Sequence, residues 1–224
     1  MVLRSALSTC ALVAFCWLVF PGTSLANSSC CSAGGFVAVL AVAGSRNFSA
    51  NGSAFVIQIT SDLAASGYSF VVGCCSGADA ALLSAVPGSI PPSMVRCFSA
   101  FGSSRAGAVP SSAVDQVFKF SRSGGSVEWL AGGALSVLPW VRLANRTKQV
   151  INAANAGLLV FFSSPRSRGS LLACRCAVSR GLPVHAFPIG FSASELPVLG
   201  AGYWLKSMEE NGYLWVNKQQ DIFT

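Results

Sequence analysis

The stretch YSFVVGCCSGADAALLSA, from Tyr68 to Ala85, indicates the fold class that the rest of the sequence continues. Phe70–Val72 is a short apolar run typical of a buried strand, and Ala78–Val86 is rich in helix-forming residues. Between them, Gly73–Gly77 is a turn of small residues. The order strand, turn, helix is the repeating unit of α/β proteins, so this stretch predicts an α/β domain.

The turn itself has two interpretations. The first amides of a helix lack intrahelical partners and attract anions. Gly73 and Gly77 are able to adopt positive φ and let a phosphate approach the backbone, with the Ser76 hydroxyl between them. Asp79 lies in the first turn of the helix, where it caps the helix or holds a ligand hydroxyl. The alternative is a short glycine turn that joins a strand to a helix, as in any α/β protein.

Composition supports one well-packed core and an anionic partner. The chain has 224 residues, 52% of them hydrophobic and 10% charged, which excludes a disordered chain. The net charge of +7 suits a nucleotide, a nucleic acid or a membrane surface. Arginines gather in the C-terminal half, where they form either a binding patch or a solvated helix face; they are Arg142, Arg146, Arg166, Arg168, Arg175 and Arg180.

The nine cysteines predict neither a metal site nor a cofactor. None has Cys-x-x-Cys spacing, and His185 is the only histidine. Most are expected to be small buried apolar residues. Cys74 and Cys75 lie in the turn before the helix, where the helix N-terminus lowers a thiol pKa. Because the sequence supplies no resolving partner or base, we expect no redox function there.

Residues 1–29 form a separate hydrophobic segment. Arg4 precedes an apolar run from Ala6 to Phe20, and a Ser-x-Ala ending follows at Ser24–Ala26. This design matches a secretory signal, a membrane anchor acting through residues 5–20, or an extension that packs on the domain. The remainder of the chain argues for the cytoplasm.

Strands and helices alternate through residues 35–190. The apolar runs predict strands that are buried on both faces, and the helical spacing of the segments between them predicts covering helices. We therefore predict a Rossmann-like open parallel sheet with helices on both faces. The further expected strands are Gly35–Ala43, Met94–Phe98, Gly157–Phe162 and Pro183–Phe187, and the further expected helices are Ser53–Ser66, Ser111–Ser121, Trp140–Ala154 and Leu171–Arg180. The segment Gly124–Pro139 is consistent with an interrupted helix or a loop.

The C-terminal extension, residues 191–224, differs in character. Tyr203–Lys206 and Tyr213–Val216 flank an Asn-Gly pair and predict an aromatic hairpin. The hairpin is expected to cover an edge of the sheet. Its aromatic rings either pack against the domain or stack nucleic-acid bases.

Four motifs stand at predicted strand ends or on the following helices: Gly44-Ser45-Arg46, Gly73–Asp79, Asn145-Arg146 and Arg168-Gly169-Ser170. In this order the chain resembles the SLOG superfamily of Rossmann-like proteins, and within it the DprA/Smf-like DNA-processing proteins or their small stand-alone relatives. The resemblance covers residues 35–190. Ala144 stands where those proteins have the first arginine of an Arg-Asn-Arg element, and no histidine follows Asp79.

The resemblance implies a protein that binds the phosphate of a nucleotide or nucleic acid, with a role in DNA processing or uptake. The expected partners are a nucleotide-derived ligand, single-stranded DNA, a membrane through residues 5–20, and a second copy of the chain. The expected ligand-binding residues are Gly44, Ser45, Arg46, Gly73, Ser76, Gly77, Asp79, Asn145, Arg146, Arg168, Gly169 and Ser170.

The alternative is an enzyme that hydrolyses the N-glycosidic bond of a nucleotide, as LOG-type proteins do. Those proteins have a glutamate after a glycine-rich turn, whereas Leu171–Arg180 contains no carboxylate. Such an activity has to recruit Asp79 or Glu128 as its acid or base. We therefore expect a binding protein rather than an enzyme, and the sequence identifies no catalytic residue.

Overall fold

The computed structural model describes residues 37–108, 112–207 and 212–218. The hydrophobic N-terminal segment and its three interpretations lie outside these residues. Within the described part of the chain, no helix combines the length and the apolar character needed to cross a membrane.

The predicted parallel sheet is confirmed, and it contains eight described strands in the order β4-β3-β2-β1-β5-β6-β8-β7. The first six of these are parallel neighbours, while β8 is antiparallel to both β6 and β7. The strands are β1 (Val39–Gly44), β2 (Ser69–Val72), β3 (Val95–Phe98), β4 (Ser126–Glu128), β5 (Gly157–Phe162), β6 (Val184–Pro188), β7 (Gly202–Lys206) and β8 (Tyr213–Asn217).

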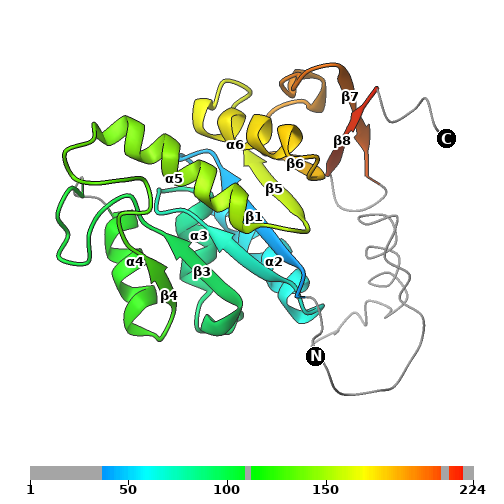
Figure 1. The fold of residues 1–224 in the computed structure, drawn as a ribbon. Helices are drawn as coiled ribbons and strands as arrows, with labels where there is room; N and C mark the ends of the chain where they lie inside the picture. The colour runs from blue at the N-terminus through cyan, green and yellow to red at the C-terminus, as the bar shows by residue number, and fades with distance from the viewer. Residues whose placement is uncertain (1–36, 109–111, 208–211, 219–224) are drawn as a thin grey trace, which may run out of the picture. The chain divides into compact units, whose positions relative to one another are not determined.

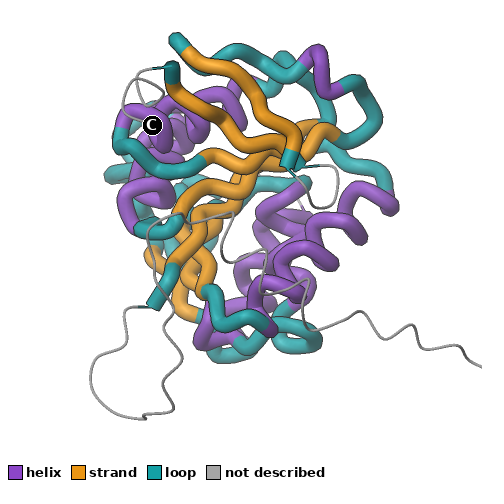
Figure 2. Tube along the Cα trace, turned by 90° about the vertical axis from the view of Figure 1, so that its right-hand side faces the viewer, coloured by secondary structure: helices purple, strands orange, loops and turns teal. Residues whose placement is uncertain are grey.

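Helices cover both faces of the sheet, as predicted. Figure 1 shows α2, α3 and α4 on one face and α5 and α6 on the other, and Figure 2 shows the strands passing between the two groups. The helices are α2 (Ala50–Ala65), α3 (Ala78–Ala85), α4 (Ser112–Arg122), α5 (Pro139–Ala153) and α6 (Arg168–Ser179). The stretch that opened the sequence analysis forms β2, the turn and α3, within one residue of its expected bounds.

The core lies on both sides of the central strands. All six residues of β5 are buried, which explains its uninterrupted apolar sequence. On one face, the ring of Phe161 stacks on that of Phe187 with centroids 4.9 Å apart, and Phe55 from α2 packs edge-on against both. On the other face, α5 and α6 pack through Ile151, Ala173 and neighbouring apolar residues.

The segment Gly124–Pro139 is neither the interrupted helix nor the plain loop that the sequence suggested. It begins with the edge strand β4, whose three residues pair with β3. The strand has almost no apolar pattern because its outer edge faces solvent, and an ion pair between Arg96 and Glu128 links it to β3. A loop then leads from β4 to α5.

The aromatic hairpin is present as β7 and β8, with its Asn-Gly turn partly outside the described residues. It covers the edge of the sheet by joining it, since His185 and Ala186 of β6 are in register with Leu214 and Tyr213 of β8. The rings of Trp204 and Trp215 lie edge to face, 5.1 Å apart. These two tryptophans therefore serve packing.

Candidate anion-binding groove

A groove opens where the chain reverses its direction across the sheet. From β1 the chain proceeds outward through β2, β3 and β4, and α5 then returns it to β5 on the other side of β1. Open α/β sheets bind ligands at this switch point, beyond the carboxyl ends of the strands. Here a cavity of about 800 Å³ lies at the ends of β1 and β5, between α5 and the beginning of α6.

The Gly44-Ser45-Arg46 motif forms one wall of the groove. Ser45 is buried, and its hydroxyl accepts a hydrogen bond from the Ser163 amide at 2.9 Å, which ties the end of β1 to the end of β5. A side chain on Gly44 would overlap the Cβ of Ala78 at 2.6 Å. Arg46 is exposed at the rim of the groove, where its guanidinium is available to a ligand.

A buried ion pair closes the base of the groove. The Asp79 carboxylate accepts from the Cys75 amide at 3.0 Å and lies 3.4 Å from Arg146 Nη1, and both side chains are only 7% exposed. Burial raises the pKa of Asp79 to about 7, and the Arg146 charge opposes that shift without cancelling it. Gly73 makes room for this pair, since a Cβ there would lie 1.6 Å from Arg146 Nη1.

Only one of the two turn glycines adopts the positive φ that the sequence suggested for both. Gly77 has φ +79°, and a Cβ there would lie 1.9 Å from the Ser45 carbonyl oxygen. Gly73 is outside the positive-φ region and is required for space instead. The turn is therefore adapted to close packing against β1 and α5.

The N-terminus of α6 faces the groove. Ser167 precedes the helix, but its hydroxyl bonds to the Ser170 hydroxyl at 2.8 Å and leaves the helix without a side-chain cap. The first-turn amides have no intrahelical acceptors, so they are available to an anion. Arg168 and Gly169 line the groove at this end.

The structure brings seven of the twelve predicted ligand residues to the groove: Gly44, Ser45, Arg46, Asp79, Arg146, Arg168 and Gly169. The other five lie outside its lining. Gly73 and Gly77 pack beneath it, Ser170 is fully buried, and Ser76 lines a neighbouring cavity. The Asn145 amide donates to the Gly132 carbonyl and so holds the loop before α5.

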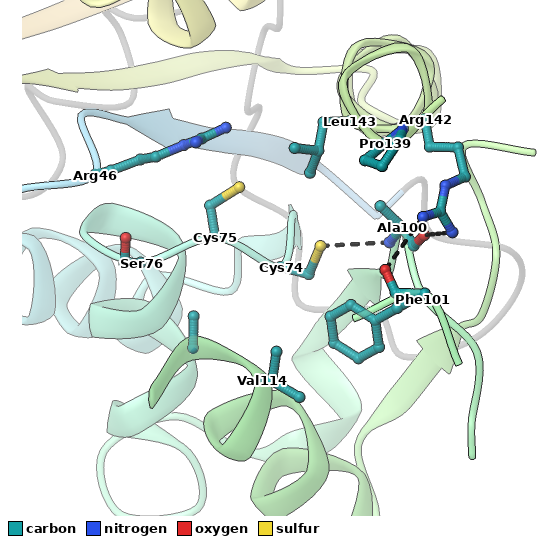
Figure 3. A pocket seen from close by; sticks show the side chains of 12 residues that line it. Arg46, Cys74, Cys75, Ser76, Ala100, Phe101, Val114, Pro139, Arg142 and Leu143 are labelled. Carbon is teal, nitrogen blue, oxygen red and sulfur yellow. Dashed lines mark hydrogen bonds between the residues drawn. The ribbon is translucent and has the colours of Figure 1, made fainter. Parts of the chain in front are cut away.

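The neighbouring cavity, about 260 Å³ in volume, lies beyond the ends of β2 and β3. Figure 3 shows Arg46 and Arg142 at its two ends with Cys74 and Cys75 between them. Arg142 is buried, and its guanidinium donates to the carbonyls of Ala100 and Gly107 at 3.1 Å each. Arg46, Cys75 and Leu143 line both cavities, so the two adjoin.

The expected ligand-binding residues did not include two residues at the rim of the groove, although Arg166 belongs to the arginine cluster noted in the sequence. Trp140 is 68% exposed and lines the groove from the first turn of α5, and Arg166 lines it from the loop before α6. The signal for Trp140 was present, because Trp140, Ala144 and Thr147 share a helix face with Ile151. All four line the groove.

Catalytic groups are sparse in the groove. Asp79 is the only carboxylate among the described residues that line it, and its Oδ2 atom already accepts from the Cys75 amide and from Arg146. Glu128 is on β4 and pairs with Arg96 outside the groove.

No protein-family model matches the sequence, and no curated protein sequence is significantly similar to it. Solved structures share the fold. DNA processing protein A from Helicobacter pylori, for which a single-stranded DNA binding mode is described, matches with a TM-score of 0.53 and 18% identity, over 69% of this chain and 67% of that one. DNA processing protein A (DprA) from Streptococcus pneumoniae matches with a TM-score of 0.52 and 22% identity, over 71% of this chain and 53% of that one.

The fold is therefore Rossmann-like α/β, with its groove at the switch point of the sheet. The fold resemblance to DprA that the sequence motifs implied is confirmed. The chain spans between one half and two thirds of the length of the DprA structures it matches.

Proposed function

We propose that the groove at the ends of β1 and β5 binds the phosphate backbone of single-stranded DNA and that the protein acts in DNA processing. The observation that supports this most is the charge of the groove. Four arginines line it against the single described carboxylate of Asp79; they are Arg46, Arg146, Arg166 and Arg168. Such an excess of positive charge in a concave surface attracts a polyanion.

The residues of the groove have distinct functions in this proposal. Arg46, Arg166 and Arg168 are exposed and contact phosphate oxygens directly, together with the first amides of α6. Arg146 is buried and engaged with Asp79 and Cys75, so it contributes its field from the base of the groove. Trp140 offers an exposed indole on which a base stacks.

The structural neighbours support the nucleic-acid interpretation. Single-stranded DNA binding is described for the H. pylori protein that shares this fold. Phosphate contacts and stacking on an aromatic ring read no particular base, so we expect binding without sequence preference. A mononucleotide offers one phosphate group and one base to the same groove and is expected to bind far more weakly than an oligonucleotide.

Fluorescence anisotropy of a labelled oligothymidine, measured over a series of salt concentrations, tests the proposal. Binding should weaken steeply with salt, because each neutralised phosphate of a single strand contributes about −0.7 to the slope of log K against log salt. Arg168→Ala should lower the affinity and reduce the magnitude of the slope by about 0.7. Arg175→Ala is the matched control, since Arg175 is exposed on the same helix but outside the groove.

Binding that is indifferent to salt, or equal losses in the Arg168 and Arg175 variants, would contradict the proposal. A mononucleotide that displaces the oligonucleotide at equal concentration would instead identify a nucleotide site. Release of free base from nucleoside monophosphates would establish the hydrolytic alternative. Association with membranes through residues 5–20 and pairing of two copies of the chain stay predictions.

A further inference from the structure

A buried arginine of the smaller cavity has no counter-charge among the described residues. Arg142 belongs to α5 and is only 3% exposed, and its guanidinium donates to the carbonyls of Ala100 and Gly107. None of the ion pairs in the described part of the chain includes it. A cation that is removed from water needs an anionic partner to offset the lost hydration. Two neutral carbonyls do not supply that negative charge.

The hydrogen-bonding capacity of Arg142 is also unfilled. A guanidinium carries five N–H donors, and the two carbonyls accept from Nη1 and Nη2 only. Its Nε atom is buried and has no hydrogen-bond partner among the described residues. The donors of an arginine are arranged so that two of them bind the two oxygens of one carboxylate. A carboxylate would therefore supply both the missing charge and the missing acceptor.

Arg146 provides a comparison within the same helix. It lies one turn after Arg142 on α5 and is also buried. The protein pairs Arg146 with the Asp79 carboxylate, whose Oδ2 atom lies 3.4 Å from Nη1. Arg142 has the same burial without such a carboxylate, which distinguishes it as the arginine that a ligand would neutralise.

The guanidinium of Arg142 is held in place before any ligand arrives. The loop after β3 closes on it through Gly107, which has φ +75° and whose Cβ, if present, would lie 2.4 Å from Arg142 Nη1. The carbonyls of Ala100 and Gly107 fix the two terminal nitrogens. A fixed cation loses little conformational entropy when an anion binds to it.

The rest of the smaller cavity is largely apolar. Its volume is about 260 Å³, and no carboxylate is found among its described lining residues. Figure 3 shows the apolar side chains of Phe101, Val114 and Leu143 around it, with Arg46 and Arg142 at opposite ends. Ligand pockets typically combine such apolar walls with a few polar groups that fix orientation.

We propose that the smaller cavity is a binding site for a small organic carboxylate with a compact apolar body. The carboxylate pairs with the Arg142 guanidinium, and the apolar body packs against Phe101 and Val114. Arg46 adds positive charge at the other end and so favours an anion over a neutral molecule. The site is separate from the proposed DNA groove, because Arg142 does not line that groove.

Isothermal titration calorimetry of the full chain with three probes tests the proposal. Phenylacetate carries both an apolar ring and a carboxylate, phenylacetamide keeps the ring without the charge, and acetate keeps the charge without the ring. We expect phenylacetate to bind at least about tenfold more tightly than either of the others, since each lacks one of the two interactions. This comparison uses the unaltered sequence.

Two variants locate the carboxylate. Arg142→Gln removes the charge and should weaken phenylacetate binding by about tenfold or more, with loss of the preference over phenylacetamide. Arg168→Ala is the matched control, because Arg168 lines the groove but not the smaller cavity, and phenylacetate binding should be unchanged. Thermal unfolding checks that both variants are folded. Hydrogen–deuterium exchange of the unaltered chain gives a second measurement, in which phenylacetate should slow exchange in residues 100–107.

Equal affinities for phenylacetate and phenylacetamide, or no binding of phenylacetate, would overturn the proposal. Equal losses in the Arg142 and Arg168 variants, or protection of residues 163–170 in place of 100–107, would place the anion in the groove and would overturn it as well. The titrations contain no nucleic acid, so their outcome is independent of DNA binding in the groove.

Discussion

The ion pair of Asp79 and Arg146 both links packed elements and places charge beneath the groove. Asp79 accepts from the Cys75 amide that precedes its own helix, so it braces the turn between β2 and α3. Arg146 reaches the same carboxylate from α5. The pair thereby joins α3, α5 and the turn beneath the groove, and Gly73 is the residue whose missing side chain permits the contact.

The raised pKa of Asp79 predicts a specific pH dependence of stability. Burial raises this pKa from 3.8 to about 7, so the folded state holds a proton more tightly than the unfolded chain between those values. The contribution of Asp79 is fully present below pH 4 and is lost as pH rises through 7. Relative to Asp79→Asn, the wild-type unfolding free energy should fall by up to about 4 kcal/mol across this window.

Urea denaturation at a series of pH values measures this difference. His185 has the opposite effect on the pH dependence of the unfolding free energy. Burial lowers its pKa to about 4, so the unfolded chain binds more protons between pH 4 and 6.5 and stability rises with pH over that range. Subtracting the Asp79→Asn curve removes that contribution, which both proteins share. A difference curve that is flat between pH 4 and 7 would show that Arg146 holds Asp79 ionised.

Gly73 and Gly169 form a matched pair of glycine positions. Gly73→Ala places a methyl group against Arg146 and Asp79, both buried, and should destabilise the protein by about 1–3 kcal/mol. Gly169→Ala meets nothing within 4 Å and lies in the first turn of α6, so it should be neutral or slightly stabilising. Thermal or urea unfolding of both variants checks the prediction, which equal effects would contradict.

At the scale of the elements, α5 supplies the aromatic part of the proposed site. Trp140→Ala should weaken binding of an oligothymidine by about 1–3 kcal/mol, since it removes one stacked base. Leu138→Ala is the control, because Leu138 is exposed just before the same helix but does not line the groove. Anisotropy titrations compare the two, and an equal loss in both variants would argue against stacking on Trp140.

Element types were predictable where a segment has one dominant pattern. The continuous apolar run of β5 and the small-residue turn before α3 determine their structure locally, and both appear as expected. β4 was missed because backbone pairing with β3, rather than its own side chains, makes it a strand. The helix-face pattern places Trp140 with Ala144, Thr147 and Ile151, but only the packing of α5 shows that this face lines the groove and leaves the indole exposed.

The function of buried polar residues was predictable only in part. Asp79 and Arg146 were both expected at the site, but the contact between them joins residues 67 positions apart in the sequence. The hydrogen bond from Arg146 to Cys75 Sγ likewise depends on α5 crossing the end of β2. Such contacts arise from tertiary packing and have no local sequence signal.

At the scale of the whole molecule, the order of the strands determines where the groove lies. Three strands extend from β1 in one direction, and β5 and β6 extend in the other. The loops after β1 and β5 therefore diverge from one point and leave the groove between them. The hairpin of β7 and β8 continues the sheet at the β6 edge, beyond β5 and away from this point.

Hydrogen–deuterium exchange of the full chain, with and without saturating oligothymidine at low salt, tests the central claim most directly. The first amides of α6 lack intrahelical acceptors and should exchange rapidly in the free protein. We predict that DNA slows exchange in residues 163–170 and 45–47, that high salt abolishes the protection, and that β7 and β8 are unchanged. Protection confined to the hairpin or to α4, with residues 163–170 unaffected, would contradict the account.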